Sequence, residues 1–127
     1  VHGHEAVEIN SRDAAARGIA EGDLVMVRNE RGGCIGGAMV SDDLMPGVVM
    51  VSTGAWFDPL AGADGEAAIC KHGNPNVLAP DIATSPLSQG PAAHSCLVEI
   101  TRYEGPPVEV TAFEPPRFVA RRDGKAG

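Results

Sequence analysis

The sequence is poor in aromatic residues and in positive charge. Its 127 residues include one Trp, one Tyr and three Phe, and 10 Lys plus Arg against 17 Asp plus Glu leave a net charge of −7. Nucleic acids and anionic membranes bind basic surfaces, so this acidic balance argues against both as partners. With so few aromatics, the hydrophobic core has to be built from Val, Ile, Leu, Met and Ala.

Long hydrophobic runs are also missing. No apolar stretch approaches the roughly 20 residues that cross a membrane, and the first residues do not resemble a signal peptide. Hydrophobic residues nevertheless make up 43% of the chain, a normal share for a globular protein, which argues against disorder over the whole length. The length is sufficient for one domain with one core.

Neither a zinc site nor a disulfide framework is favoured. Cys34, Cys70 and Cys96 lie far apart and form no Cys-x-x-Cys pair, so we expect three reduced thiols and a reducing compartment. His2 and His4 would share one face of an extended segment, but no third ligand is near them in the sequence. We therefore expect no metal site.

A self-contained active site cannot be found by spacing either. The sequence has no carboxylate pair, nucleophile elbow or Cys/His dyad for which a catalytic role can be argued. The glycine pairs at 32–33 and 36–37 lack the strand–Gly-x-Gly-x-x-Gly–helix context of a nucleotide-binding fold, and we interpret them as hairpin glycines. Asp42 and Asp43 are expected in a solvated turn.

Glycine and proline are abundant, with 16 and 10 residues, which is typical of many turns and shaped loops. A cap at Asn10 or Ser11 and a left-handed Gly18 predict a short helix between them. Hydrophobic patterns between the turns predict strands at 7–9, 24–28, 34–40, 48–51, 97–103 and 108–113. Together these elements predict a mainly β fold, a small barrel with helical crossovers.

Residues 52–93 follow a different pattern. They show no sustained periodicity, and a loop of this length is usually functional or disordered, but its apolar residues favour order. The loop contains Asn74 and Asn76 on either side of a proline. Their amides could donate to and accept from the edge of a neutral heterocycle such as a pterin, or could merely form Asx turns. The residues alone do not decide between these two interpretations.

Several motifs resemble one known family. They are Asp-Ala-Ala-Ala-Arg-Gly-Ile (13–19), Gly-Asp-Leu-Val-Met-Val (22–27), Gly-Ala-Trp-Phe-Asp-Pro (54–59) and His-Gly-Asn-Pro-Asn-Val-Leu (72–78). Over residues 3–116 the chain resembles the C-terminal dinucleotide-binding domain of molybdopterin oxidoreductases of the dimethyl sulfoxide reductase family. The last two motifs resemble the branch that reduces biotin sulfoxide, dimethyl sulfoxide and trimethylamine N-oxide.

The resemblance implies a double-psi β barrel with short crossover helices and one long ordered loop over residues 1–116, followed by a flexible tail at 117–127. It also implies a bis(molybdopterin guanine dinucleotide) molybdenum cofactor. The cofactor and the other domains of the same enzyme are then the partners of this chain. Because the molybdenum ligand belongs to an earlier domain in the family, no catalytic residue is expected here, and the fragment alone should be inactive.

The resemblance also implies cofactor-binding residues. Asn76 matches the loop amide that bonds the pterin, and His94 stands where family members often have Gln. Other residues are expected to shape the same pocket: His72, Gly73, Asn74 and Gln89.

Two further points concern the family motifs. Trp56 and Asp58 are expected near the substrate funnel, although Trp56 could instead pack beneath the loop. The chain departs from the family at residues 3–6, which read Gly-His-Glu-Ala where members commonly have Gly-Arg-Glu-Pro. We therefore do not expect this chain to make the cofactor contact that the Arg would make in the family.

The function implied is the cofactor-binding domain of an S-oxide or N-oxide reductase. Residues 89–94 resemble the biotin sulfoxide type, which is cytoplasmic, in agreement with the unpaired thiols; a periplasmic location is the alternative. An alternative is a stand-alone double-psi barrel that binds a protein or peptide as an adaptor. A self-processing decarboxylase on the same barrel would need a Gly-Ser cleavage site, and the sequence contains no Gly-Ser dipeptide.

Overall fold

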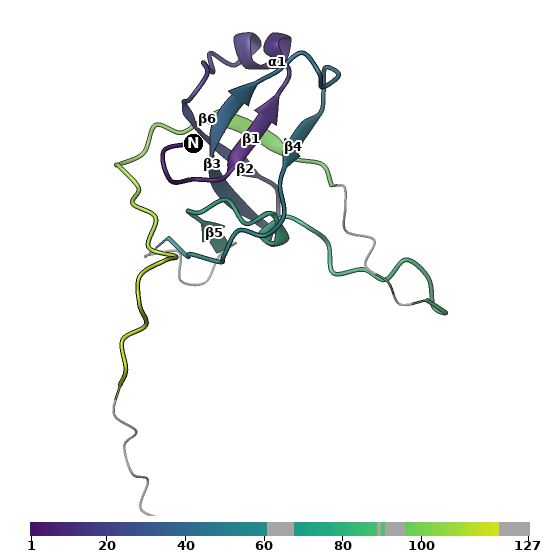
Figure 1. Ribbon diagram of the computed structural model, residues 1–127. Helices are drawn as coiled ribbons and strands as arrows, with labels where there is room; N and C mark the ends of the chain where they lie inside the picture. Colours follow the sequence, from purple (N-terminus) through teal and green to yellow (C-terminus); the bar gives the residue numbers. More distant parts are fainter. Residues whose placement is uncertain (61–67, 89, 91–95, 120–127) are drawn as a thin grey trace, which may run out of the picture.

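A computed structural model describes residues 1–60, 68–88, 90 and 96–119. Strands dominate these residues and only short helices accompany them, so the predicted mainly β fold is confirmed (Figure 1). In chain order the elements are β1 (Ala6–Ile9), α1 (Ser11–Ala16), β2 (Leu24–Arg28), β3 (Gly32–Val40), β4 (Val49–Val51), β5 (Ala68–Cys70), the 3-10 helix η1 (Pro75–Val77) and β6 (Glu99–Arg102).

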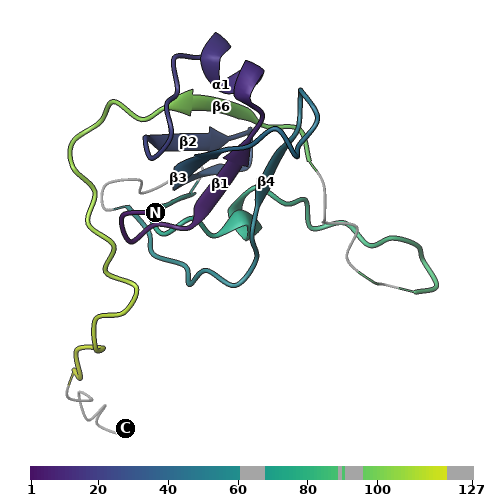
Figure 2. The same ribbon diagram turned by 45° about the horizontal axis from the view of Figure 1, so that its top comes forward.

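The six strands form one sheet with β3 at its centre. The order is β4-β1-β3-β2-β6, and β5 also pairs with β3. Strand β2 is antiparallel to β3 along one edge, while β1 and β5 run parallel to it along the other edge, one after the other. The sheet curls into a barrel-like shape, and among the described strands its two ends, β4 and β6, do not pair (Figure 2).

Aliphatic side chains fill the interior of this sheet, as the composition predicts. Strand β2 alternates, so that Val25 and Val27 are buried while their neighbours are less covered. Val7 and Ile9 of β1 face the same interior, which Leu78 and Ile100 complete from the loop and from β6. The aliphatic side chains of elements far apart in the sequence thus share one core.

Helix α1 begins and ends as predicted. The Asn10 side chain caps it by accepting a hydrogen bond from the Arg12 N–H at 2.9 Å and donates to the Leu44 carbonyl at 2.7 Å. Gly18 adopts a φ of 64° just beyond the helix, in the left-handed region that glycine enters without strain. Asp42 and Asp43 lie in the expected exposed turn.

The interpretation of the glycine pairs as hairpin glycines is wrong. Both pairs lie within β3, and Asn29 closes the β2–β3 turn by accepting from the N–H groups of Arg31 and Gly32. A Cβ on Gly36 would meet the Glu5 carbonyl oxygen at 2.9 Å. A Cβ on Gly32 would lie 2.7 Å and 2.8 Å from two other carbonyl oxygens. Glycine is therefore required here because other segments approach the centre of the sheet closely.

Two further expectations need correction. Residues 52–93 contain regular elements, because β5 pairs with β3 and η1 follows it. Residues 108–113 form no strand. The Thr111 N–H instead donates to the Asp58 carboxylate at 2.6 Å, so a side chain takes the place of a neighbouring strand.

The chain beyond β6 runs down one side of the sheet and away from it (Figures 1 and 2). Residues 117–119 are exposed, and residues 120–127 lie outside the described part, so the boundary at 116 and the flexible tail stay predictions. Within the described residues, no helix has the length and apolar character needed to span a membrane.

Candidate functional site

The turn at 72–78 is fixed by its own side chains. Asn74 accepts a hydrogen bond from the Asn76 N–H at 2.9 Å, which is an Asx turn, and Pro75 occupies the start of η1. The Asn76 side chain is exposed at the outside of this turn. The two interpretations of the amides are therefore compatible, because Asn74 builds the turn that presents Asn76.

His72 and Gly73 lie beneath the turn. The buried ring of His72 donates from Nδ1 to the Trp56 carbonyl at 3.2 Å, and its Nε2 lies 4.0 Å from a Glu5 carboxylate oxygen. A Cβ on Gly73, whose φ is 102°, would lie 2.8 Å from the Cβ of Glu5. Both residues thus shape the turn from inside the protein, while the part expected for them in a cofactor pocket stays a prediction.

The thiol of Cys70 connects three parts of the loop. Its Sγ accepts hydrogen bonds from the N–H groups of Asp58 and Asn74, each at 3.4 Å, and donates to the Trp56 carbonyl at 3.7 Å. The sequence predicts an ordinary reduced thiol at this position, so the hydrogen bonds that Cys70 makes within the loop were missed. No sequence pattern indicates that the backbone groups of Trp56, Asp58 and Asn74 surround this sulfur.

The other two thiols differ in their surroundings. Cys34 is the β3 partner of Cys70 and is buried, whereas Cys96 is exposed. Burial, together with the neighbouring thiols of Cys70 and Cys96, raises the pKa of Cys34 to about 12, so this thiol is neutral at physiological pH. All three are free cysteines, as predicted.

Asp58 points into the protein. Its carboxylate accepts from the N–H of Thr111 at 2.6 Å and from the Thr111 hydroxyl at 2.8 Å, and lies 3.6 Å from the Lys71 ammonium. Burial alone would raise the pKa of Asp58, but the hydrogen bonds from Thr111, the Lys71 charge and the Ala112 N–H outweigh it and lower the pKa. The carboxylate therefore stays ionised and joins the 54–60 segment to the C-terminal segment.

Trp56 does not pack beneath the loop, so that alternative is wrong. Its backbone carbonyl is held by Cys70 and His72, while its side chain is exposed together with that of Phe57. The position expected for Trp56 near a substrate funnel stays a prediction. Asp58, whose oxygens are engaged by Thr111 and Lys71, holds the backbone next to it.

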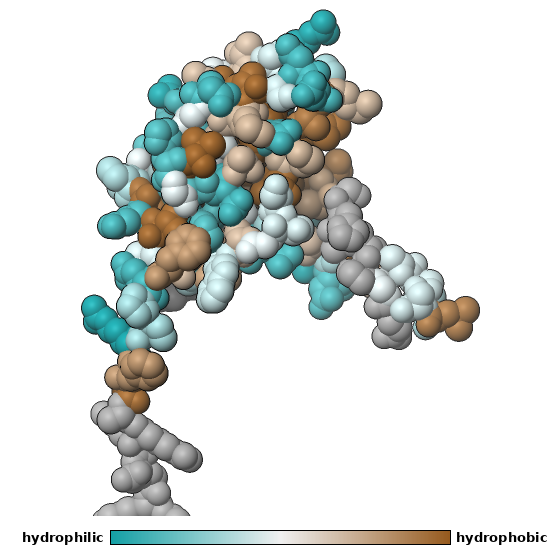
Figure 3. Space-filling view, viewed as in Figure 1, coloured by the Kyte–Doolittle hydropathy of each residue, from teal (hydrophilic) through white to brown (hydrophobic). Residues whose placement is uncertain are grey.

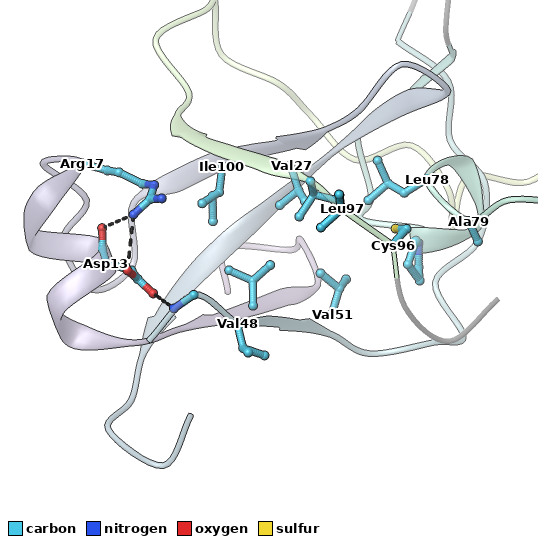
Figure 4. Close-up of a pocket in the computed structure, with 14 residues that line it drawn as sticks. Asp13, Arg17, Val27, Val48, Val51, Leu78, Ala79, Cys96, Leu97 and Ile100 are labelled. Atoms are coloured by element: carbon cyan, nitrogen blue, oxygen red, sulfur yellow. Dashed lines mark hydrogen bonds and ion pairs between the residues drawn. The ribbon is translucent and has the colours of Figure 1, made fainter. Parts of the chain in front are cut away.

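A cavity of about 420 Å³ lies between the two unpaired ends of the sheet (Figure 4). Its walls are mostly aliphatic and come from β2, β4, β6 and the end of η1. The lining residues are Asp13, Arg17, Val27, Gly47, Val48, Val49, Val51, Pro75, Leu78, Ala79, Cys96, Leu97, Val98 and Ile100. The turn that presents Asn76 therefore stands at the margin of an apolar hollow.

The charged groups of this cavity neutralise each other. Asp13 lies 3.6 Å from the Arg17 guanidinium and accepts from the Gly47 N–H at 2.6 Å. These two residues are the charged ones among the described residues that line the cavity. The hollow therefore suits an uncharged group better than a phosphate.

A family model described as "Molydopterin dinucleotide binding domain" matches residues 1–97. The chain belongs to this family. It is 54% identical to a trimethylamine-N-oxide reductase of Salmonella typhimurium, over 91% of this chain and 14% of the relative. It is 46% identical to a dimethyl sulfoxide/trimethylamine N-oxide reductase of Cereibacter sphaeroides, over 92% and 14%. The chain thus spans about one seventh of the length of these relatives.

The residues of this molybdopterin-family domain fit the ligand class that the family description names. A pterin is a flat heterocycle whose edge needs donors and acceptors. The exposed Asn76 has an amide that offers both, and its neighbours Pro75 and Leu78 line an apolar hollow. Gln89 and His94 lie outside the described residues, so their predicted contacts stay predictions. His4, one of the two histidines considered as metal ligands, is buried, and its Nδ1 donates to the Lys71 carbonyl at 2.6 Å. The expected absence of a metal site stays a prediction.

Proposed function

We propose that the chain is the cofactor-binding domain of a molybdenum oxidoreductase that reduces an S-oxide or an N-oxide. The family membership and the names of the relatives support this function. The structural observation that carries it is the Asx turn of Asn74, in which Asn76 is exposed and the adjacent Pro75 and Leu78 line an apolar cavity.

In this proposal the chain binds part of a bis(molybdopterin guanine dinucleotide) cofactor. The Asn76 amide bonds the pterin edge, with His94 and Gln89 as further contacts, while His72, Gly73 and Asn74 hold the turn in place. The bound group supplies the oxygen-atom transfer and the two-electron chemistry, and the protein supplies position and electrostatics. Because Asp13 and Arg17 neutralise each other in the cavity, other domains meet the phosphates.

The proposed substrate class is that of the relatives, trimethylamine N-oxide and dimethyl sulfoxide. The preference for biotin sulfoxide receives no support from the names of these relatives. Turnover of the three compounds by the full-length holoenzyme distinguishes the substrates. A cytoplasmic location is also part of the proposal, and fractionation of cells that produce the natural polypeptide tests it.

The site is tested by Asn76→Ala in the full-length enzyme, with Thr53→Ala as a control that removes another exposed polar side chain. Losing one amide hydrogen bond to the pterin, worth about 1 kcal/mol, should weaken cofactor retention roughly fivefold. Molybdenum and pterin contents per polypeptide measure this after dialysis. If the Asn76 variant retains cofactor as well as the Thr53 variant does, the assignment of Asn76 is wrong.

A further inference from the structure

Trp56 combines an exposed side chain with a firmly held backbone. Its side chain is 68% exposed, but its carbonyl accepts hydrogen bonds from the Cys70 thiol at 3.7 Å and from the His72 ring at 3.2 Å. Two residues further along, the buried Asp58 donates its N–H to the Cys70 sulfur and binds Thr111 through its carboxylate. Buried polar groups thus fix the backbone that carries an exposed indole.

The same contacts attach Trp56 to the turn that is proposed to bind the cofactor. His72, which donates to the Trp56 carbonyl, is the first residue of the turn at 72–78. The Cys70 sulfur, which also bonds this carbonyl, accepts from the N–H of Asn74, whose side chain closes the turn. The indole is therefore available to a small molecule that approaches a cofactor bound at this turn.

The surroundings of this segment are apolar and acidic. The bonds from Thr111 to Asp58 join it to the C-terminal segment, and Figure 3 shows apolar side chains gathered at the lower left, where that segment leaves the body. The partly exposed Glu5 carboxylate lies 4.0 Å from the His72 ring, whereas the Lys71 side chain is only 15% exposed and pairs with Asp58. A positively charged group is therefore favoured here over an anion.

A methylated ammonium group fits an exposed indole in such surroundings. The negative π face of Trp attracts cations more strongly than that of Tyr or Phe, and quaternary ammonium groups are recognised by aromatic rings in this way. Trimethylamine N-oxide, a substrate in the proposed function, carries its formal positive charge on a nitrogen with three methyl groups. Dimethyl sulfoxide has two methyl groups and no ammonium nitrogen, so it gains less from the same ring.

We propose that the Trp56 indole binds the trimethylammonium head of N-oxide substrates and so sets the preference for N-oxides over S-oxides. This inference rests on the proposed function, because it concerns the substrate of the same enzyme. The indole contacts the methyl groups rather than the oxygen that is transferred. It therefore strengthens substrate binding and leaves the rate of turnover nearly unchanged.

The test compares Trp56→Leu, which keeps an apolar side chain without a π face, with Trp56→Phe in the full-length holoenzyme. We expect Trp56→Leu to raise the KM for trimethylamine N-oxide roughly fivefold, which corresponds to about 1 kcal/mol. The KM for dimethyl sulfoxide and the kcat for both substrates should change by less than about twofold. Trp56→Phe should restore most of the affinity for the N-oxide.

Equilibrium binding supplies a readout that does not depend on turnover. Tetramethylammonium has a similar head without the oxygen, and tert-butanol is a neutral molecule of similar size. In ligand-observed NMR titrations of the holoenzyme, Trp56→Leu should weaken tetramethylammonium binding roughly fivefold and leave tert-butanol unaffected. Phe118→Leu is the matched control, because it removes another aromatic side chain, 96% exposed, and should change neither titration.

Fluorinated tryptophans introduced at position 56 alone keep the test decisive if Trp56→Leu does not fold. Fluorine weakens the negative π face with little change in size, so the KM for trimethylamine N-oxide should rise with each added fluorine while that for dimethyl sulfoxide stays constant. Equal changes for the two substrates, or tetramethylammonium binding that is independent of residue 56, would overturn the proposal. A natural full-length enzyme that neither holds cofactor nor reduces these compounds would instead contradict the proposed function.

Discussion

The sheet body (residues 6–51) and the joined loops (54–58, 70–78 and 111–113) are held together by different interactions. Strand pairing and packed aliphatic side chains hold the sheet body, so its free energy of unfolding is shared among many residues. The joined loops share some of these interactions, since Cys70 pairs with Cys34 and the Lys71 N–H donates to the Asp58 carbonyl, but three polar side chains connect their segments: Asp58, Cys70 and His72. The difference implies that a substitution in the sheet body affects the whole fold, while one in the joined loops releases a particular segment.

The largest effect is expected in the sheet body, from Ile9→Ala. Ile9 is fully buried and pairs with Val40 on one side and Val49 on the other. Removing its side chain leaves a cavity and should lower the free energy of unfolding by about 3 kcal/mol. Urea unfolding followed by circular dichroism measures the change.

Met50→Ala is the matched control for this prediction, because Met50 lies in the neighbouring strand but is 45% exposed. It should cost less than about 1 kcal/mol. Hydrogen exchange in the Ile9 variant should accelerate in both regions. Equal losses in the two variants would show that the core does not dominate the stability of the sheet body.

A smaller effect is expected in the joined loops, from Asp58→Asn. The substitution weakens the bonds to Thr111 and removes the ion pair with Lys71, so we expect a loss of about 2 kcal/mol at pH 7. The pKa of Asp58 is lowered from 3.8, so its contribution to stability is present above that pH. As the pH falls further, through the folded-state pKa, this contribution is lost.

The pH dependence separates this prediction from a general packing defect. The stability difference between the natural chain and Asp58→Asn should be constant near neutral pH and should shrink below about pH 4. Hydrogen exchange at neutral pH should accelerate mainly at 54–58 and 108–113. The variant Asp81→Asn, at an exposed carboxylate, should show neither change. A difference independent of pH would contradict the assigned role of the ionised carboxylate.

The same contrast explains what the sequence could predict. Alternating valines predict β2 to the residue, and Asn10 and Gly18 predict the ends of α1, because neighbours in the chain determine these features. In the joined loops, Thr111 bonds to Asp58, which lies 53 residues away, and no local pattern marks that pair. The residues at 108–113 have the composition of a strand, but this segment pairs with no strand in the described part of the chain and is held by Asp58 instead, so the strand prediction was wrong. The proline and the two amides predict the turn at 72–78 from local sequence, and the family resemblance implies its role at a cofactor, whereas the contacts of the Cys70 thiol leave no local pattern.

The smallest effect concerns two asparagines that cap helices in the two regions. Asn10→Ala in the sheet body loses the cap of α1 and a buried bond to the Leu44 carbonyl, so we expect a loss of about 1–2 kcal/mol. Asn74→Ala in the joined loops loses one bond at a partly exposed turn, and we expect about 0.5 kcal/mol. Asn74→Asp keeps the accepting oxygen and should unfold like the natural chain.

Urea unfolding and hydrogen exchange distinguish the two caps. Asn10→Ala should lower the urea midpoint of the whole domain, whereas Asn74→Ala should accelerate exchange at 74–78 with little change in the midpoint. Because the turn presents Asn76, Asn74→Ala should also weaken cofactor retention in the full-length enzyme, and Asn74→Asp should restore most of it. If Asn74→Ala lowered the midpoint as much as Asn10→Ala, the joined loops would be part of the same cooperative unit as the sheet body.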